Sequence, residues 1–437
     1  MDDDKNFDYK LDFDEEISVQ NKWPKSAKIL LGIFICLTIL IIGGALAVFF
    51  IFDKKLREKS NNQQSQSLNP TPTPTLNFDN YEFFGTIESN LTYDVNGKIE
   101  NSFKKDGDDY HDEIGNLNNG KNYDKNDRNI YDLYIPQFAL ERKKETNGII
   151  LWIHGGAWIK GDKEANDKYC KLFSTQGYIT ATVGYTLLID EYKEFNIYRI
   201  LDEITACIKG IKLKLKEKGF DENKLLLSIG GFSAGGHLSL LYSYLIKKFD
   251  IIPLKFIINF VGPIGMSKKE YFLGLTSLNN SLSNIEELST IEEAYKNGTL
   301  KPIPNDEFRL SFMNRFMGNK STTKELESIL LPNKTINASD ERYKELIKFS
   351  KYANILEIED INKFPTICFY GGIDEVVGVS AFAYLKQKML KDKRPYTFFY
   401  SRYEGHKLSQ SKSKDVLPNT WERNSIIMQY LKKYFGY

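Results

Sequence analysis

The feature that most constrains the fold is a glycine-rich turn between an apolar strand and an amphipathic helix. The strand is expected over Leu225 to Ile229 and the helix over Gly235 to Lys248, with Gly231, Phe232, Ser233, Ala234 and Gly235 at the turn. Small neighbours permit a sharp turn that exposes the serine hydroxyl at the edge of a sheet. The pattern favours a nucleophilic Ser233. The alternative, a glycine turn of a nucleotide-binding fold, lacks the G-x-G-x-x-G or P-loop lysine that such folds carry.

A serine hydroxyl becomes a nucleophile near neutral pH only when a base takes its proton, and histidine suits that role. The chain contains 4 histidines. His111 lies in a polar segment, His154 follows another strand, and His237 lies one turn beyond Ser233 on the next helix. His406 follows the last expected strand and precedes the C-terminal helix, so we predict it to be the base.

The wider pattern is one of apolar runs that alternate with longer amphipathic stretches, which is typical of βαβ units and predicts an α/β protein with a doubly wound, mostly parallel sheet. Further helices are expected over Tyr198 to Lys218 and Ser380 to Lys391. Residues 267 to 360 interrupt the alternation with a polar, mostly helical insertion, expected to cap the carboxyl ends of the strands. The other expected strands are Gly148 to Ile153, Tyr178 to Tyr185, Phe256 to Val261, Thr366 to Tyr370 and Tyr396 to Tyr400.

The segment His154, Gly155, Gly156, Ala157, Trp158 resembles the H-G-G-x segment of the esterase and lipase branch of the α/β-hydrolases. The resemblance implies an oxyanion hole made by the backbone N–H groups of Gly156, Ala157 and Ala234, with Gly155 as a further candidate. A plain Gly-Gly turn beside a packed tryptophan is the alternative for this segment.

Asp374 follows the strand Thr366 to Tyr370 in a segment that resembles the G-x-x-D-x-x-V of the same superfamily, which places its acid there. The resemblance therefore implies Asp374 as the carboxylate that orients His406, with Glu375 as the fallback. The chain order of Ser233, Asp374 and His406 is that of the α/β-hydrolases.

Several other segments extend the resemblance, which covers roughly residues 128 to 262 and 364 to 437. They are Tyr131 to Pro136, like a D-x-Y-x-P strand; Gly161, Asp162 and Lys163; and Tyr185, Thr186 and Leu187, like a Y-R-L motif whose arginine is replaced. The chain looks most like small carboxylesterases of the hormone-sensitive-lipase, feruloyl or acetylxylan esterase, kynurenine formamidase and prenylcysteine methylesterase kind. Residues 79 to 127 and 267 to 360 match no family segment.

The N-terminal part of the chain has a different composition. Ile29 to Phe52 carries no charge, and this predicts a single transmembrane helix, or signal-anchor, after a polar tail of residues 1 to 28. A cleaved signal peptide is the alternative. Residues 53 to 78 are rich in Pro, Thr and Asn and are expected to form a disordered linker to a hydrolase domain over 79 to 437.

The localisation follows from that segment. We expect a single-pass membrane protein that contacts the membrane through residues 29 to 52, with a lumenal or extracellular catalytic part. N-x-S/T sequons favour that side of the membrane and predict a glycoprotein. They lie at Asn90, Asn279, Asn297, Asn319, Asn333 and Asn337.

Composition excludes some partners and cofactors. A formal net charge of +1 provides no field to attract nucleic acid. The 4 cysteines form no C-x-x-C or Cys/His cluster, so no metal is implied, although one disulfide stays open. The residues and the resemblance together predict a serine carboxylesterase that acts on a small or acylated ester without a cofactor. An amidase, formamidase or peptidase with the same residues, and a non-catalytic adhesion domain of this fold, are the alternatives.

Overall fold

The computed structural model of the 437-residue chain divides it into two units, Met1–Thr73 and Pro74–Tyr437, and the described residues belong to the second unit. These residues are 82–93, 128–189, 196–246, 251–276, 282, 287–303, 305–318, 321–350, 353–360, 362–408 and 420–437.

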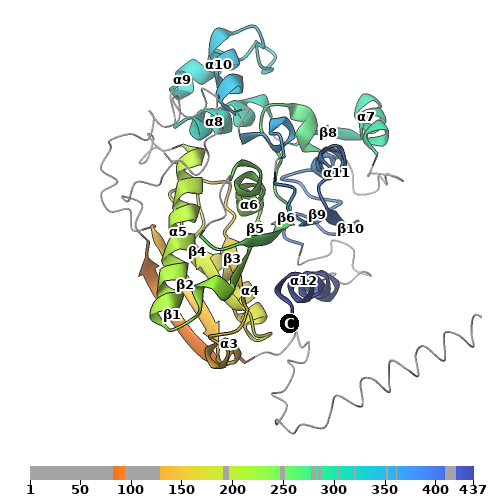
Figure 1. Cartoon of the computed structure of the whole chain (residues 1–437). Coiled ribbons are helices and arrows are strands. Elements are labelled where there is room, and N and C mark those ends of the chain that lie inside the picture. Colours follow the sequence, from red (N-terminus) through yellow and green to blue (C-terminus); the bar gives the residue numbers. More distant parts are fainter. Residues whose placement is uncertain are drawn as a thin grey trace, which may run out of the picture. The chain divides into compact units, whose positions relative to one another are not determined.

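The centre of the second unit is an 8-stranded sheet with the order β1-β2-β4-β3-β5-β6-β9-β10 (Figure 1). Strand β2 pairs antiparallel with both β1 and β4, and the pairs from β4 to β10 are parallel. The prediction of an α/β protein with a mostly parallel sheet is therefore confirmed. The strands are β1 Gly85–Thr92, β2 Ile130–Pro136, β3 Asn147–Ile153, β4 Ile179–Val183, β5 Leu225–Phe232, β6 Leu254–Phe260, β9 Thr366–Gly371 and β10 Tyr396–Ser401.

The central strands are continuous apolar runs because helices cover both of their faces. Every residue of β3 is buried. On one face, Trp152 of β3 packs against Tyr169 and Phe173 of helix α4 (Asp167–Ser174). On the same face, Phe256 of β6 packs against α12 (Thr420–Phe435), through Tyr430, Tyr434 and Phe435.

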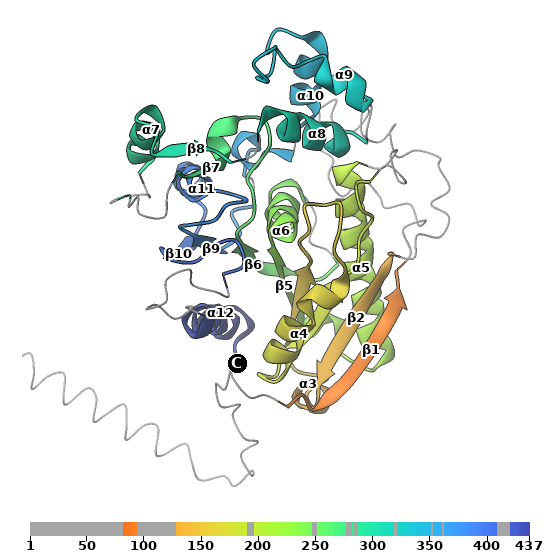
Figure 2. The same cartoon turned by 180° about the vertical axis from the view of Figure 1, so that it is seen from behind.

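Three helices cover the opposite face: α5 (Ile197–Glu217), α6 (Ala234–Leu245) and α11 (Ser380–Asp392). Gly210 of α5 lies against Tyr131 of β2, and Phe382 of α11 meets Tyr370 of β9 edge-to-face. Helix α5 crosses in front of the strands in Figure 1, and α4 does so in Figure 2. A short helix, α3 (Gln137–Glu141), follows β2 directly.

Strand β1 was not predicted, because its sequence gives no apolar run. Its residues Gly85–Thr92 alternate between exposed and half-buried positions at the edge of the sheet, where only one neighbour covers them. Other strand boundaries differ by a few residues: β5 continues to Phe232, and β4 ends at Val183 rather than at Tyr185. Tertiary pairing extends β5 through Gly230 and Gly231, which lie in register with Trp152 and Ile153 of β3.

The segment expected to be a helical insertion contains short helices and a small two-stranded sheet. The sheet pairs β7 (Leu273–Leu275) with β8 (Leu300–Pro302) in antiparallel register, which was not predicted. Arg309 of α8 (Asp306–Phe316) donates to the carbonyl oxygens of Met266 and Ser267 at 3.1 and 2.7 Å, and so connects α8 to the residues where the segment begins. The helices are α7 Leu288–Lys296, α8 Asp306–Phe316, α9 Thr323–Glu327 and α10 Glu341–Ser350.

The prediction of a single-pass membrane protein is corrected. Within the ranges given above, no helix is long and apolar enough to cross a membrane. The apolar segment 29–52, on which that prediction depended, lies outside the described residues, as do the tail 1–28 and the linker 53–78.

Of the cysteines, Cys170, Cys207 and Cys368 lie in the described part of the chain and are buried and unpaired. Burial raises the pKa of the Cys368 thiol to about 12. The disulfide that the sequence left open does not form among these residues.

Candidate active site

Ser233 lies at the sharp corner between β5 and α6. Its φ of 56° and ψ of −117° place it outside the helical and extended regions, and α6 begins at the next residue. The Ser233 N–H donates to the carbonyl oxygen of Phe260 at 2.8 Å, and the Ser233 carbonyl accepts the N–H of His237 at 3.0 Å. The corner is thus hydrogen-bonded on both sides. The serine side chain is 9% exposed.

Two glycines let the chain turn this tightly. A Cβ atom on Gly231 would lie 2.2 Å from the carbonyl oxygen of Gly235, and one on Gly235 would lie 2.0 Å from the carbonyl oxygen of Ile153. Both obstacles are backbone atoms, which cannot rotate away. The strained corner is therefore possible only with glycine at both positions, and the missing Cβ of Gly235 lets α6 approach the end of β3.

His406 bridges Ser233 and Asp374. Its Nε2 lies 2.9 Å from Ser233 Oγ, and its Nδ1 lies 2.8 Å from Asp374 Oδ2. A carboxylate can only accept at Nδ1, so that nitrogen carries the proton and Nε2 is left to accept from the hydroxyl. The ring of Phe232 meets the imidazole edge-to-face at 5.5 Å between centroids. The three side chains thus form a continuous chain of hydrogen bonds.

Asp374 is held from the other side by its own loop. Its Oδ1 accepts the backbone N–H groups of Val376 and Val377 at 2.8 and 3.0 Å, and the residue is 3% exposed. Oδ2 is thereby directed to His406. The neighbouring Glu375, the fallback acid, is exposed, and the carboxylate in contact with the imidazole is that of Asp374.

The segment Gly155 to Trp158 adjoins the serine. Gly156, Ala157 and Trp158 all have positive φ, at 114°, 52° and 60°. The Gly156 carbonyl accepts the N–H groups of Ile159 and Lys160 at 3.1 and 3.0 Å, which closes the turn. A Cβ atom on Gly155 would lie 2.7 Å from the Phe232 carbonyl and 3.2 Å from Ser233 Cβ. The backbone of this segment therefore passes within contact distance of the serine.

The N–H group of Ala234 directly follows Ser233, at the start of α6. The first helical hydrogen bond of α6 comes from His237, so the N–H of Ala234 precedes the intrahelical bonding. No hydrogen bond within the described part of the chain uses the backbone N–H of Gly156 or Ala157 as donor. The N–H of Ala234 lies at the start of α6, where partial positive charge favours an anion.

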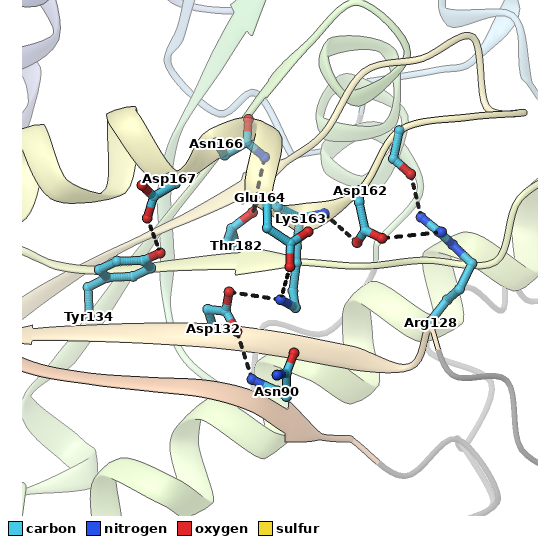
Figure 3. A network of polar contacts seen from close by, with 11 residues as sticks. Asn90, Arg128, Asp132, Tyr134, Asp162, Lys163, Glu164, Asn166, Asp167 and Thr182 are labelled. Carbon is cyan, nitrogen blue, oxygen red and sulfur yellow. Dashed lines mark hydrogen bonds and ion pairs between the residues drawn. The ribbon is translucent and has the colours of Figure 1, made fainter.

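A polar network anchors the segment that follows Trp158 (Figure 3). Lys163 is 2% exposed, and its Nζ donates to Asp132 of β2 at 2.9 Å and to Glu164 at 2.5 Å. Burial opposes its charge, but the hydrogen bonds that Lys163 donates to Glu164 and Asp132 outweigh this and raise the pKa of Lys163. Arg128 donates to the Gly161 carbonyl at 2.6 Å and pairs with Asp162 at 3.5 Å.

Further contacts in Figure 3 tie the same segment to β4 and to β2: Asn166 donates to Thr182 at 3.1 Å, and the Tyr134 hydroxyl donates to Asp167 at 2.5 Å. The network thus fixes residues 161–167 against neighbouring strands. Sequence reasoning singled out Gly161, Asp162 and Lys163 but missed their partners, because Arg128, Asp132 and Thr182 lie far away along the chain.

The imidazoles of the two other described histidines bind groups other than Ser233. His154 donates from Nδ1 to the Gly155 carbonyl at 2.7 Å and stacks on Tyr185 at 4.1 Å between centroids. His237 donates from Nε2 to the Ala353 carbonyl at 2.8 Å and meets Trp158 edge-to-face. Burial lowers the pKa of each to about 4. His111 lies outside the described residues.

His237 makes stability depend on pH. Its pKa of about 4 in the folded chain is below the ordinary 6.5, so between these values the unfolded chain binds a proton that the folded chain does not. The free energy of unfolding should therefore fall as pH drops through this window, by up to about 1.4 kcal/mol per pH unit. His237→Gln keeps a donor for Ala353 and removes this titration.

Urea unfolding at about pH 7.5 and about pH 5 measures the effect. The variant should lose less stability on acidification than the unsubstituted protein. Part of the loss should persist, because the buried His154 titrates in the same window. An unchanged loss in the variant would contradict the prediction.

The insertion also touches this site. Phe312 and Phe316 of α8 pack on Trp158 at 5.5 and 5.0 Å between centroids, and the Arg315 guanidinium donates to the Leu188 carbonyl at 2.8 Å. Helix α8 is therefore in direct contact with the residue that follows Ala157.

Among the described residues, no group of three or more His, Cys, Asp and Glu side chains could hold a metal ion.

Comparison with known proteins supports the recognition of the chain as an α/β-hydrolase of the carboxylesterase type. Residues 131–295 match the model of the BD-FAE family, an esterase family of α/β-hydrolases. The match contains the His154 to Trp158 segment and Ser233, and it ends before Asp374 and His406. An arylesterase of Saccharolobus solfataricus is 28% identical over 99 residues, which are 22% of this chain and 30% of that protein.

Solved structures give more distant likenesses. Esterase B from Lactobacillus rhamnosis has 14% identity and a TM-score of 0.47, with 90% of this chain and 95% of that one covered. A truncated carbohydrate esterase from gut microbiota also has 14% identity and a TM-score of 0.47, with 81% and 98% covered.

Proposed function

We propose that this protein hydrolyses carboxylic esters through an acyl-enzyme intermediate on Ser233. The observation that carries the proposal is the bridging position of His406, with one ring nitrogen 2.9 Å from Ser233 Oγ and the other 2.8 Å from Asp374 Oδ2. This geometry gives each residue a role in acyl transfer: Ser233 as nucleophile, His406 as general base and Asp374 as the group that orients the base.

In the first step, Ser233 Oγ attacks the ester carbonyl while its proton moves to His406 Nε2. Asp374 stabilises the imidazolium that forms and keeps the proton on Nδ1. The fixed position of Asp374 Oδ1 on two backbone N–H groups supports this role, because the carboxylate cannot turn away from the histidine.

The negative charge of the tetrahedral intermediate would be held by the N–H groups of Gly156, Ala157 and Ala234, with that of Gly155 as a further candidate. Each such donor contributes a few kcal/mol when it is already aimed at the developing oxyanion. The network around Lys163 supports the assignment, because it fixes the far end of the same loop in advance of the reaction.

The protonated His406 then gives its proton to the leaving alkoxide, and the alcohol departs. A water molecule, deprotonated by the same imidazole, attacks the acyl-enzyme and releases the carboxylic acid, which restores Ser233. One ester and one water thus give one acid and one alcohol, and the cycle leaves the protein unchanged.

Two findings favour an ester over an amide. The family whose model matches is an esterase family, and the curated relative is named an arylesterase. The arylesterase match spans 30% of that protein, so the ester preference is proposed from the matched part alone.

We also infer how the chain is organised around this site. The hydrolase domain spans about residues 79 to 437, and the insertion of about residues 267 to 360 shapes the acyl pocket. The contact of Phe312 and Phe316 with Trp158 supports this, since it brings α8 next to the proposed oxyanion donors. Residues 53 to 78 would be the linker that precedes the domain.

The test is a substrate panel on the full chain, made of p-nitrophenyl esters of increasing acyl length beside p-nitroanilides and formyl amides, with a fluorophosphonate probe in parallel. The proposal predicts ester turnover and covalent labelling of Ser233. Turnover of amides in preference to esters would reassign the protein to the amidases. The absence of both turnover and labelling would favour a non-catalytic member of this fold.

A further inference from the structure

The loop that carries His406 is held at both ends by one buried arginine. Arg423, on α12, is 3% exposed and pairs with Glu404 at 2.5 Å. Its second terminal nitrogen donates to the carbonyl oxygen of Leu408 and to Thr420 Oγ1. Glu404 precedes His406 by two positions and Leu408 follows it by two, so a single guanidinium spans the segment Glu404–Leu408.

The side chain of Glu404 is 1% exposed, so its charge is buried with that of Arg423. A buried carboxylate and guanidinium keep one geometry, because loss of either partner leaves an uncompensated charge. The pair therefore holds the loop that follows β10 against α12.

The His406 loop also contacts the loop that carries Asp374 through backbone atoms. The carbonyl oxygen of Glu404 accepts the N–H of Ile373, which precedes Asp374, at 3.2 Å. A Cβ atom on Gly371 would lie 2.4 Å from the Glu404 carbonyl and 2.7 Å from that of Gly405. The two loops touch through their backbones, so a shift of one loop changes the distance from Asp374 to His406.

Within the described part of the chain, the imidazole of His406 makes its hydrogen bonds to Asp374 and Ser233 and a ring contact with Phe232, and the side chain is 19% exposed. The Leu408 backbone adopts a positive φ of 52° while its side chain is 3% exposed, which is a strained turn that its surroundings must hold in place. Arg423 is the side chain that binds the carbonyl of this residue.

We propose that Arg423 is a positioning residue for His406: its guanidinium clamps Glu404 and Leu408 and thereby holds the imidazole between Asp374 and Ser233. The inference rests on the proposed function, in which His406 is the base. A lysine at this position can pair with Glu404, but its single ammonium lacks the planar fork that also reaches the Leu408 carbonyl.

Arg423→Lys tests the proposal, with Arg394→Lys as the matched control. Arg394 is equally buried, pairs with Asp360 at 3.1 Å and donates to Thr366 and Ser243, and none of these partners belongs to the His406 loop. Both substitutions weaken a buried arginine–carboxylate pair. Only the first one loosens the loop.

The measurements are kcat and KM for a p-nitrophenyl ester, the rate of fluorophosphonate labelling, and hydrogen exchange of peptides that cover residues 401–408. Arg423→Lys should lower kcat about tenfold to a hundredfold, because small misplacements of a catalytic group have effects of this size, with KM changed less than about twofold. Labelling should slow in parallel, and exchange in the loop should rise. Arg394→Lys should retain kcat and the loop protection.

A second variant distinguishes a loss of positioning from a loss of folding. Arg423→Met with Glu404→Gln removes both charges, so no unpaired charge stays buried. This double variant should fold and still show the lowered kcat.

Wild-type kcat in Arg423→Lys, or an equal loss in Arg394→Lys, would overturn the inference. If the unsubstituted protein turned over no ester and took no label, the proposed function itself would fail, and the exchange data would still report whether Arg423 orders the loop.

Discussion

Replacing Ser233 by alanine is expected to lower kcat for an ester by about a millionfold, because the nucleophile and its base act as one unit. The fold should persist. The substitution removes one hydroxyl and its hydrogen bond to His406, which changes the free energy of unfolding by about 1 kcal/mol at most. The backbone hydrogen bonds of the corner, from Ser233 to Phe260 and from His237 to Ser233, do not involve the side chain.

The measurement compares steady-state kcat, fluorophosphonate labelling and urea unfolding of Ser233→Ala with those of Ser239→Ala. Ser239 is buried on α6, the helix that follows Ser233, where its hydroxyl donates to the Gly235 carbonyl at 2.7 Å. The control therefore loses a buried hydroxyl of the same type without touching His406, and it should keep activity and label. Residual turnover in Ser233→Ala near the unsubstituted level would refute the nucleophile.

Changing Asp374 to asparagine is expected to lower kcat by about ten-thousandfold with little change in structure. The physical reason lies in the two oxygens of Asp374. Oδ1 accepts the N–H groups of Val376 and Val377, so the carbonyl oxygen of an asparagine will occupy that position. Its amide NH2 then faces His406 Nδ1, and this forces Nδ1 to accept and Nε2 to carry the proton.

In that tautomer Nε2 can no longer take the proton of Ser233. The effect is therefore a loss of the base rather than of binding, and KM should change far less than kcat. Glu375→Gln is the matched control, because it alters the adjacent carboxylate, which is exposed, and should retain kcat. An Asp374→Asn variant as active as that control would remove Asp374 from the mechanism.

Local patterns in the sequence were enough for the core of the fold. Each central strand is a short apolar run bounded by polar or glycine residues, and β3, β5, β6 and β9 all appear where such runs were expected. These strands are buried on both faces, so their sequences report burial directly. Strand β1 was missed because its residues, half exposed at one edge of the sheet, form no apolar run, unlike those of the other edge strand, β10.

The Ser233 corner was also predictable from the sequence. Gly231 is required by a contact with the backbone of Gly235, which lies four positions away, so that requirement appears in the local sequence, whereas Gly235 is required by the distant Ile153 carbonyl. The prediction of a single-pass membrane protein also came from a local pattern. That prediction is corrected, since no helix within the described ranges is long and apolar enough to cross a membrane.

The sequence by itself determined which residues could supply a nucleophile, a base and an acid, because those choices depend on chemical type and on neighbouring strands and turns. Only the tertiary structure decided that Asp374 rather than Glu375 meets the imidazole, and that Arg128, Asp132 and Arg423 lie behind the loops of the site. The physical reason is distance along the chain. An ion pair such as Arg423 with Glu404 forms between loops and helices that packing of the sheet brings together, and no local spacing rule encodes that packing.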